Sequence, residues 1–142
     1  MILYLDTSSL LKFYLEEESS PAVRSWIAAA DLHATSRVTL PEAAAALARR
    51  QRNGGISTEE RDRAMTDIYR DWPDLVAIEL DEGRAADLAL RRGLRGFDAV
   101  QLTAALTVRQ GAGPGALAFS SFDAELNEAA RAEGLTVLEP LD

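Results

Sequence analysis

Short apolar runs alternate with longer amphipathic segments along this chain. The runs are rich in Leu, Ile, Val and Ala, which is typical of buried strands, and they predict strands at residues 2–5, 33–36, 76–80, 116–119 and 135–138. Between the runs, apolar residues recur at helical spacing. These segments predict helices at residues 7–15, 21–31, 39–52, 58–72, 81–92, 97–108 and 123–132.

Residues that begin or end helices lie between these segments. Thr7, Ser8 and Ser9 are candidate N-caps of the first helix, and Pro21 suits the first turn of the second. Glycines within residues 53–55 and 111–115 predict breaks in the chain. Strands that alternate with helices favour the α/β class, and we expect a three-layer α/β/α sandwich with a central, mostly parallel sheet, formed by a single domain over residues 1–142.

The composition limits the chemistry that is available. Cysteine is absent and His33 is the only histidine, which excludes disulfides, thiolate metal sites and a pair of catalytic histidines. The formal net charge of −8 argues against a nucleic-acid partner, unless bound cations reverse the local field. Lys12 is the only lysine among the fifteen basic residues, so the others are arginines, which suit bidentate phosphate contacts.

No apolar stretch approaches the roughly 20 residues that are needed to cross a bilayer. The first residues also lack the basic segment and cleavage pattern of a signal peptide. We therefore expect a cytoplasmic protein with no membrane partner.

Four carboxylates follow predicted strands or open predicted helices: Asp6, Glu42, Asp98 and Asp123. Each alone is explained by helix capping and the helix dipole. Together they point to a site, because strand-end residues of a parallel sheet meet at one edge. Two like charges about 4 Å apart repel by roughly 4 kcal/mol at an effective dielectric of 20, so such a cluster needs protons or a cation. Oxygen ligands favour Mg²⁺ or Mn²⁺.

The available groups favour metal-assisted chemistry over histidine chemistry. His33 lies in a predicted strand with no second histidine to act beside it, so a structural role is expected. Carboxylate-held Mg²⁺ lowers the pKa of a bound water and stabilises an in-line phosphoryl displacement. Phosphodiester hydrolysis fits this set of residues.

Four segments around these acids resemble the PIN domain, and specifically its VapC-type toxin ribonucleases: LYLDTSSLLKFY, TLPEAAAAL, RGFDAVQLTAAL and AFSSFDAEL. The resemblance extends over nearly the whole chain. It implies cleavage of RNA that depends on Mg²⁺, with Mn²⁺ as the alternative ion, inhibition by a VapB-like antitoxin, and a homodimer or dimer of dimers. It also implies that Asp6 and Asp98 are the main metal ligands, directly or through water, with Glu42 and Asp123 completing the acidic pocket.

Other residues are candidates for supporting roles. Ser8, Ser121 and Lys12 match polar positions of the family, although helix capping and a solvated helix face explain them equally well. Two arginine groups are candidates for RNA phosphate contacts, namely Arg91, Arg92 and Arg95, and Arg49, Arg50 and Arg52. Trp26, Trp72 and Phe97 are candidates for base stacking, with core packing as the alternative.

Three other functions remain as alternatives. A haloacid dehalogenase-type phosphatase also begins with a strand ending in Asp, but it needs a second Asp where this chain has Ser8. A catalytically weak PIN module could serve as a scaffold or RNA-binding subunit, although all four acids are present. The same metal chemistry would also permit a DNA nuclease, but the chain has no additional DNA-binding segment.

Overall fold

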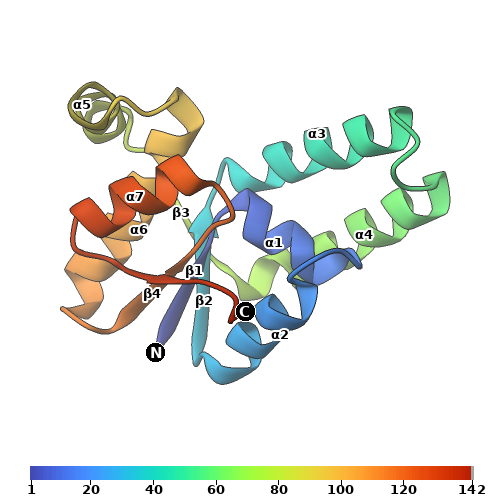
Figure 1. Ribbon diagram of the computed structural model, residues 1–142, viewed down its shortest axis with the longest axis horizontal. Coiled ribbons are helices and arrows are strands. Elements are labelled where there is room, and N and C mark those ends of the chain that lie inside the picture. The colour runs from blue at the N-terminus through green and yellow to red at the C-terminus, as the bar shows by residue number, and fades with distance from the viewer. Residues whose placement is uncertain (142) are drawn as a thin grey trace.

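Seven α-helices and five strands alternate in the computed structural model, which describes residues 1–141 (Figure 1). The strands are β1 (Ile2–Leu5), β2 (Leu32–Ser36), β3 (Val76–Ile78), β4 (Leu117–Ser120) and β5 (Thr136–Leu138). The helices are α1 (Thr7–Tyr14), α2 (Ser20–Ala29), α3 (Thr39–Arg52), α4 (Thr58–Asp71), α5 (Glu82–Arg92), α6 (Gly96–Ala112) and α7 (Ala124–Ala132). A short 3₁₀ turn, Trp72–Asp74, follows α4.

The strands form one sheet in the order β3-β2-β1-β4-β5, and every pairing is parallel. Side chains alternate between its two faces, as strand geometry requires. Tyr4 and Phe119 pack on one face with residues of α5, α6 and α7, whereas Leu3 and Leu5 pack on the other face with residues of α1 and α2. The predicted three-layer α/β/α sandwich is thereby confirmed.

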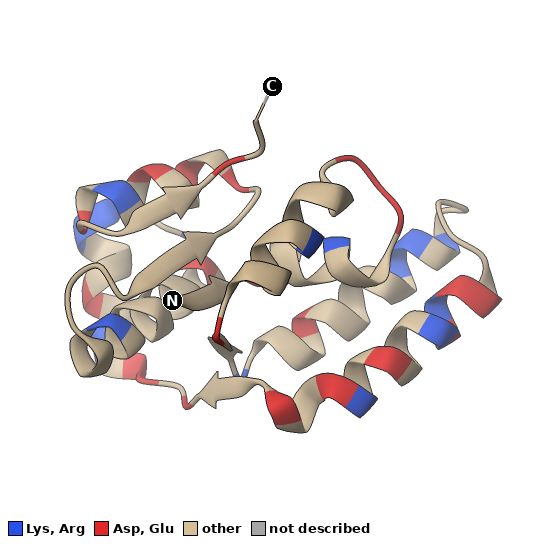
Figure 2. Ribbon diagram, turned by 90° about the horizontal axis from the view of Figure 1, so that it is seen from below, with Lys and Arg blue, Asp and Glu red and all other residues tan. Residues whose placement is uncertain are grey.

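Helices α3 and α4 form an antiparallel pair that extends away from the sheet (Figure 1). A cluster of buried side chains from α1, α3 and α4 joins the pair to the sandwich, with Leu47 and Ile68 fully buried. Ser57 and Glu60 form a reciprocal capping box at the start of α4. Basic residues gather at the far end of α3, and acidic and basic residues alternate along α4 (Figure 2).

Most element boundaries lie within two residues of the predicted ones, and the differences are clearest at α1, α6 and β3. Asp6, rather than Thr7, Ser8 or Ser9, is the N-cap of α1, because its carboxylate accepts the Ser9 N–H. Helix α6 continues past Gly111 to Ala112, and β3 ends at Ile78, two residues early, at the edge of the sheet. No helix within residues 1–141 is long and apolar enough to cross a membrane.

Candidate metal centre

All four predicted acids line one cavity of about 320 Å³ at the carboxyl edge of the sheet. Asp6 and Asp123 follow the neighbouring strands β1 and β4, and they cap α1 and α7. The Asp6 N–H donates to the Ser120 carbonyl at 3.1 Å, which aligns the ends of the two strands. Glu42 and Asp98 lie in the first turns of α3 and α6. Segments that are remote in sequence thus bring four carboxylates to one cavity.

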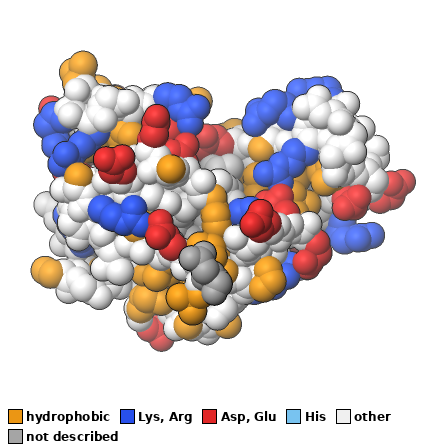
Figure 3. All heavy atoms as spheres, viewed as in Figure 1, with side chains coloured by type: hydrophobic (Ala, Val, Ile, Leu, Met, Phe, Trp, Pro, Cys, Tyr) orange, Lys and Arg blue, Asp and Glu red, His pale blue; other side chains and the backbone are white. Residues whose placement is uncertain are grey.

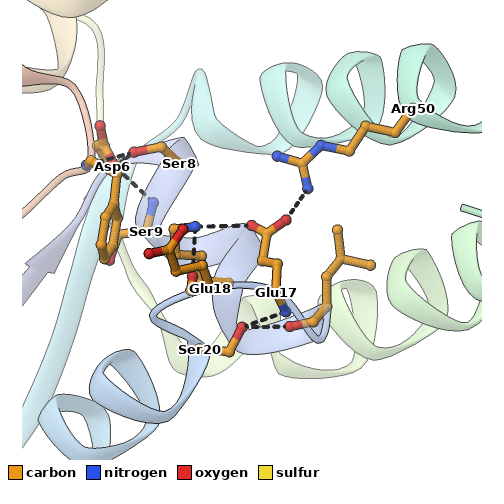
Figure 4. A network of polar contacts seen from close by, with 10 residues as sticks. Asp6, Ser8, Ser9, Glu17, Glu18, Ser20 and Arg50 are labelled. Atoms are coloured by element: carbon orange, nitrogen blue, oxygen red, sulfur yellow. Dashed lines mark hydrogen bonds and ion pairs between the residues drawn. The ribbon is translucent and has the colours of Figure 1, made fainter. Parts of the chain in front are cut away.

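Asp6 is the most deeply buried of the four, with only 5 % of its surface exposed. Its Oδ1 accepts the Ser8 hydroxyl at 2.7 Å and the Ser9 N–H at 2.9 Å (Figure 4). Burial raises the pKa of Asp6 from 3.8 to about 6, the nearby Asp98 charge adds to this rise, and the side chains of Ser121 and Ser8 with the Ser9 N–H partly offset it. The site therefore contains a carboxylate whose charge is costly without a nearby cation.

Arg95 joins the two half-buried aspartates on the other side of the cavity. Its guanidinium contacts Asp98 Oδ2 at 3.2 Å and Asp123 Oδ2 at 3.1 Å. Burial and the neighbouring Asp123 charge raise the pKa of Asp98, and Arg95 opposes that rise. Arg95 is largely exposed, and through these two ion pairs it partly balances the charge of the acidic cluster.

Glu42 is held by two neutral donors. The Thr7 hydroxyl and the Gln101 amide each donate to Glu42 Oε1 at 2.8 Å. Neither Thr7 nor Gln101 was predicted from the sequence as a site residue. A usable signal exists for Gln101, since it lies three residues after Asp98 and therefore on the same face of α6.

Two arginines of α3, Arg49 and Arg50, also line the cavity. Arg50 donates to Glu17 at 3.0 Å, on the side away from Asp6 (Figure 4). Arg49 is exposed and also lines an adjacent groove of about 830 Å³. In the space-filling view the molecule is notched between the side formed by α5, α6 and α7 and the side formed by α3 (Figure 3). An anionic ligand in this notch would meet basic side chains on the α3 wall.

Several predicted supporting residues lie outside the cavity. Lys12 contacts Glu17 and the Glu18 carbonyl and lies 4.7 Å from the centre of the Phe122 ring, so it does not line the cavity. Arg91 and Arg92 do not line it either, because both form ion pairs with Glu133, at 3.2 and 2.6 Å.

Of the two predicted serines, Ser8 lines the cavity. Ser121 is buried beneath it, where its hydroxyl accepts the Asp123 N–H at 3.0 Å. A dehalogenase-type phosphatase needs a second Asp at position 8. Here Ser8 occupies that position, and its hydroxyl donates to Asp6, so the phosphatase alternative is not supported.

The three aromatic candidates differ in exposure. Trp26 stacks on Phe122 with ring centres 6.1 Å apart, and Trp72 packs against the cluster under α3 and α4. Both therefore have packing roles. Phe97 is 60 % exposed and lines the adjacent groove together with Arg95 and Asp98.

The donor set of the cavity suits a hard divalent cation. Its predicted ligands are all carboxylates, whereas His33 bonds the Ile27 carbonyl at 2.9 Å, elsewhere in the fold. Within residues 1–141, no three His, Asp or Glu side chains are arranged to hold one ion as they stand. Mg²⁺ usually binds one or two carboxylates directly and keeps several waters. The four acids thus fit a cation that is held partly through water.

A larger cavity, of about 560 Å³, lies between α5 and α6, and Arg91 and Glu133 line it. The acidic side chains there are already paired, because Arg91 forms ion pairs with both Asp87 and Glu133. The carboxylate cavity therefore remains the better candidate for the functional site, although it is smaller.

Comparison with known proteins places these features in a family. Residues 3–132 match the PIN domain. The chain is 34% identical to Ribonuclease VapC45 and to Ribonuclease VapC49, both of Mycobacterium tuberculosis, over 96% of this chain and 94% of each relative. Its fold is similar to the crystal structure of PAE2754 from Pyrobaculum aerophilum, with a TM-score of 0.66 and 21% identity over 96% of this chain and 82% of that one.

Proposed function

The chain belongs to the PIN-domain family, and from this premise we propose that it is a divalent-cation-dependent endoribonuclease of the VapC type. The observation that carries the proposal is the convergence of Asp6, Glu42, Asp98 and Asp123 on one cavity. Four carboxylates that share a cavity are unfavourable without a cation. The names of two relatives, each matched over nearly its whole length, support RNA as the substrate.

In this proposal Asp6 and Asp98 are the main Mg²⁺ or Mn²⁺ ligands, directly or through water, and Glu42 and Asp123 complete the acidic pocket. A bound divalent cation supplies an activated water and stabilises the charge of an in-line phosphoryl transfer. Arg49, which is exposed on the cavity wall, suits a phosphate oxygen of the RNA. Ser8 and the Ser9 N–H fix the Asp6 carboxylate by donating to Oδ1.

The test is cleavage of single-stranded or loop RNA by the purified protein with Mg²⁺ or Mn²⁺. We expect Asp6→Asn and Asp98→Asn to lose cleavage while remaining folded. Asp81→Asn is the matched control, because Asp81 is also an N-cap aspartate that accepts a backbone N–H, at the start of α5 and outside the cavity. Undiminished cleavage by a folded Asp6 or Asp98 variant would show that this residue has no role in the mechanism. Cleavage that persists in EDTA would show that the reaction needs no divalent cation.

The toxin role is part of the same proposal. It includes inhibition by a VapB-like antitoxin, assembly as a homodimer or dimer of dimers, and action on cytoplasmic RNA. We expect expression of the chain alone to arrest growth, and co-expression of the neighbouring antitoxin gene to relieve the arrest. Harmless overproduction of protein that cleaves RNA in vitro would contradict the toxin role and leave the nuclease proposal standing.

A further inference from the structure

A buried chain of polar groups connects the core of the sheet to Glu42. The Tyr4 hydroxyl, fully buried in β1, donates to Gln101 Oε1 at 2.7 Å. The Gln101 amide nitrogen then donates to Glu42 Oε1 at 2.8 Å, and it also lies 3.0 Å from Thr39 Oγ1 and 3.2 Å from Thr7 Oγ1. Gln101 is only 3 % exposed, so these contacts do not compete with bulk water.

The orientation of the Gln101 amide follows from its neighbours. A carboxylate accepts hydrogen bonds and cannot donate them, so the NH₂ group of Gln101 must face Glu42. Its oxygen then faces Tyr4, whose hydroxyl must be the donor. A flipped amide would place oxygen against oxygen at Glu42 and remove the acceptor of the Tyr4 proton. The Glu42 carboxylate and the Tyr4 hydroxyl thereby favour the same amide orientation, and hydrogen bonds in such a chain polarise and strengthen one another.

We propose that Gln101 is a positioning residue, which, oriented by Tyr4, fixes the Glu42 carboxylate toward the cation cavity. The inference rests on the proposed function for the role of the cavity, but the network itself is independent of it. Thr7 donates to the same oxygen of Glu42, so Oε1 is occupied by two protein donors. Oε2 has no hydrogen bond to the protein within residues 1–141 and remains available to a cation or its water shell. Gln101, which lines the cavity but is not one of the predicted ligands, thus sets the geometry of one of its carboxylates.

Gln101→Met tests this role, because Met is similar in size and cannot donate. Groups that orient metal ligands typically contribute about 10- to 100-fold in metal affinity or activity. We expect Gln101→Met to weaken Mn²⁺ binding to the RNA-free protein by about tenfold or more, as measured by titration calorimetry. We also expect kcat for RNA to fall while KM changes little. Tyr4→Phe should change both quantities in the same direction by less, because it removes one of the two groups that orient the amide while Glu42 still favours the same orientation.

Thr103→Val is the matched control. Thr103 is also a buried polar residue of α6, but its hydroxyl has no hydrogen-bond partner within residues 1–141. We expect this variant to bind Mn²⁺ and to cleave RNA as the wild type does, so an effect confined to Gln101 and Tyr4 separates positioning from general packing of the helix.

The outcomes separate this inference from the proposed function. Weaker Mn²⁺ binding in Gln101→Met and Tyr4→Phe, with Thr103→Val unchanged, supports the inference even if the wild type cleaves no RNA. Wild-type Mn²⁺ affinity and kcat in folded Gln101→Met overturn it while the nuclease proposal stands. If Gln101→Met does not fold, Tyr4→Phe decides, because its ring still stacks on Phe119, and unchanged Mn²⁺ affinity in that variant overturns the inference.

Discussion

Asp6→Asn should stabilise the metal-free fold although it removes a predicted metal ligand. Asp6 is only 5 % exposed, and burial raises the pKa of its carboxyl group from 3.8 to about 6. Asn is nearly the same size, and its oxygen can still accept the Ser9 N–H that caps α1. The substitution therefore keeps the cap and removes the buried charge.

The sign and size of the effect follow from proton linkage. Because the folded-state pKa of Asp6 lies above the unfolded value, the folded state binds more protons between pH 4 and 6 and loses stability as the pH rises through this window. The loss is complete above the folded-state pKa. A shift from 3.8 to about 6 corresponds to about 3 kcal/mol in the free energy of unfolding at neutral pH. For a domain of this size that is roughly 10 °C in Tm.

Urea unfolding in EDTA, at pH 4 and at pH 7.5, measures this effect. We expect Asp6→Asn to exceed the wild type by about 3 kcal/mol at pH 7.5 and to match it near pH 4. The exposed-cap variant Asp81→Asn should stay within about 0.5 kcal/mol of the wild type at both pH values. Added Mn²⁺ should then stabilise the wild type more than Asp6→Asn. An Asp6→Asn protein that is no more stable than the wild type at pH 7.5, or a difference that does not depend on pH, would refute the reasoning.

Two further predictions concern arginines of the cavity. Arg95→Gln should raise the Mn²⁺ affinity of the RNA-free protein by up to about fivefold, because Arg95 competes with a cation for Asp98 and Asp123 and exposed ion pairs are weak. Arg91→Gln, whose pairs lie outside the cavity, should leave the affinity unchanged. A lower affinity in Arg95→Gln would contradict this competition. Arg49→Ala should weaken RNA binding and reduce the slope of log affinity against log salt by about 0.7. Arg63→Ala on α4, outside the cavity, is its control, and an equal effect of both would indicate a general charge effect.

The fold was largely predictable because each element carries its own local signal. Asp81 and Asp123 lie at the starts of α5 and α7, as predicted, where both are N-caps, and Asn53 ends α3 before two glycines. The errors lie where tertiary packing decides. Gly111 does not end α6, because the last turns of the helix are fixed from outside, in part by the bond from Arg109 to the Glu133 carbonyl at 2.8 Å.

The arginines of the site were not predictable in the same way. Arg91, Arg92 and Arg95 are equivalent in sequence terms, since all three precede Asp98 in a basic run. The fold separates them, because the chain turns at Gly93 with a positive φ of 66° and only Arg95 then reaches the cavity. Arg91 and Arg92 stay on α5 and meet Glu133, which follows α7. The turn of the backbone at Gly93 decides which arginine reaches which carboxylate. The hydrophobic periodicity of the sequence carries no information about this turn.

The meeting of the acids in one cavity was predictable from the topology of the sheet. A parallel sheet brings the residues after β1 and β4 together whatever their side chains are, and the register of Leu5 with Ser120 makes Asp6 a neighbour of Ser121. Gln101 escaped prediction because its role depends on Tyr4, almost a hundred positions away, on the inward face of β1. A buried glutamine beside a predicted ligand is costly unless its donors and acceptor are all satisfied. Its position on the face of α6 that carries Asp98 is therefore an indication that this helix contributes more than one group to the site.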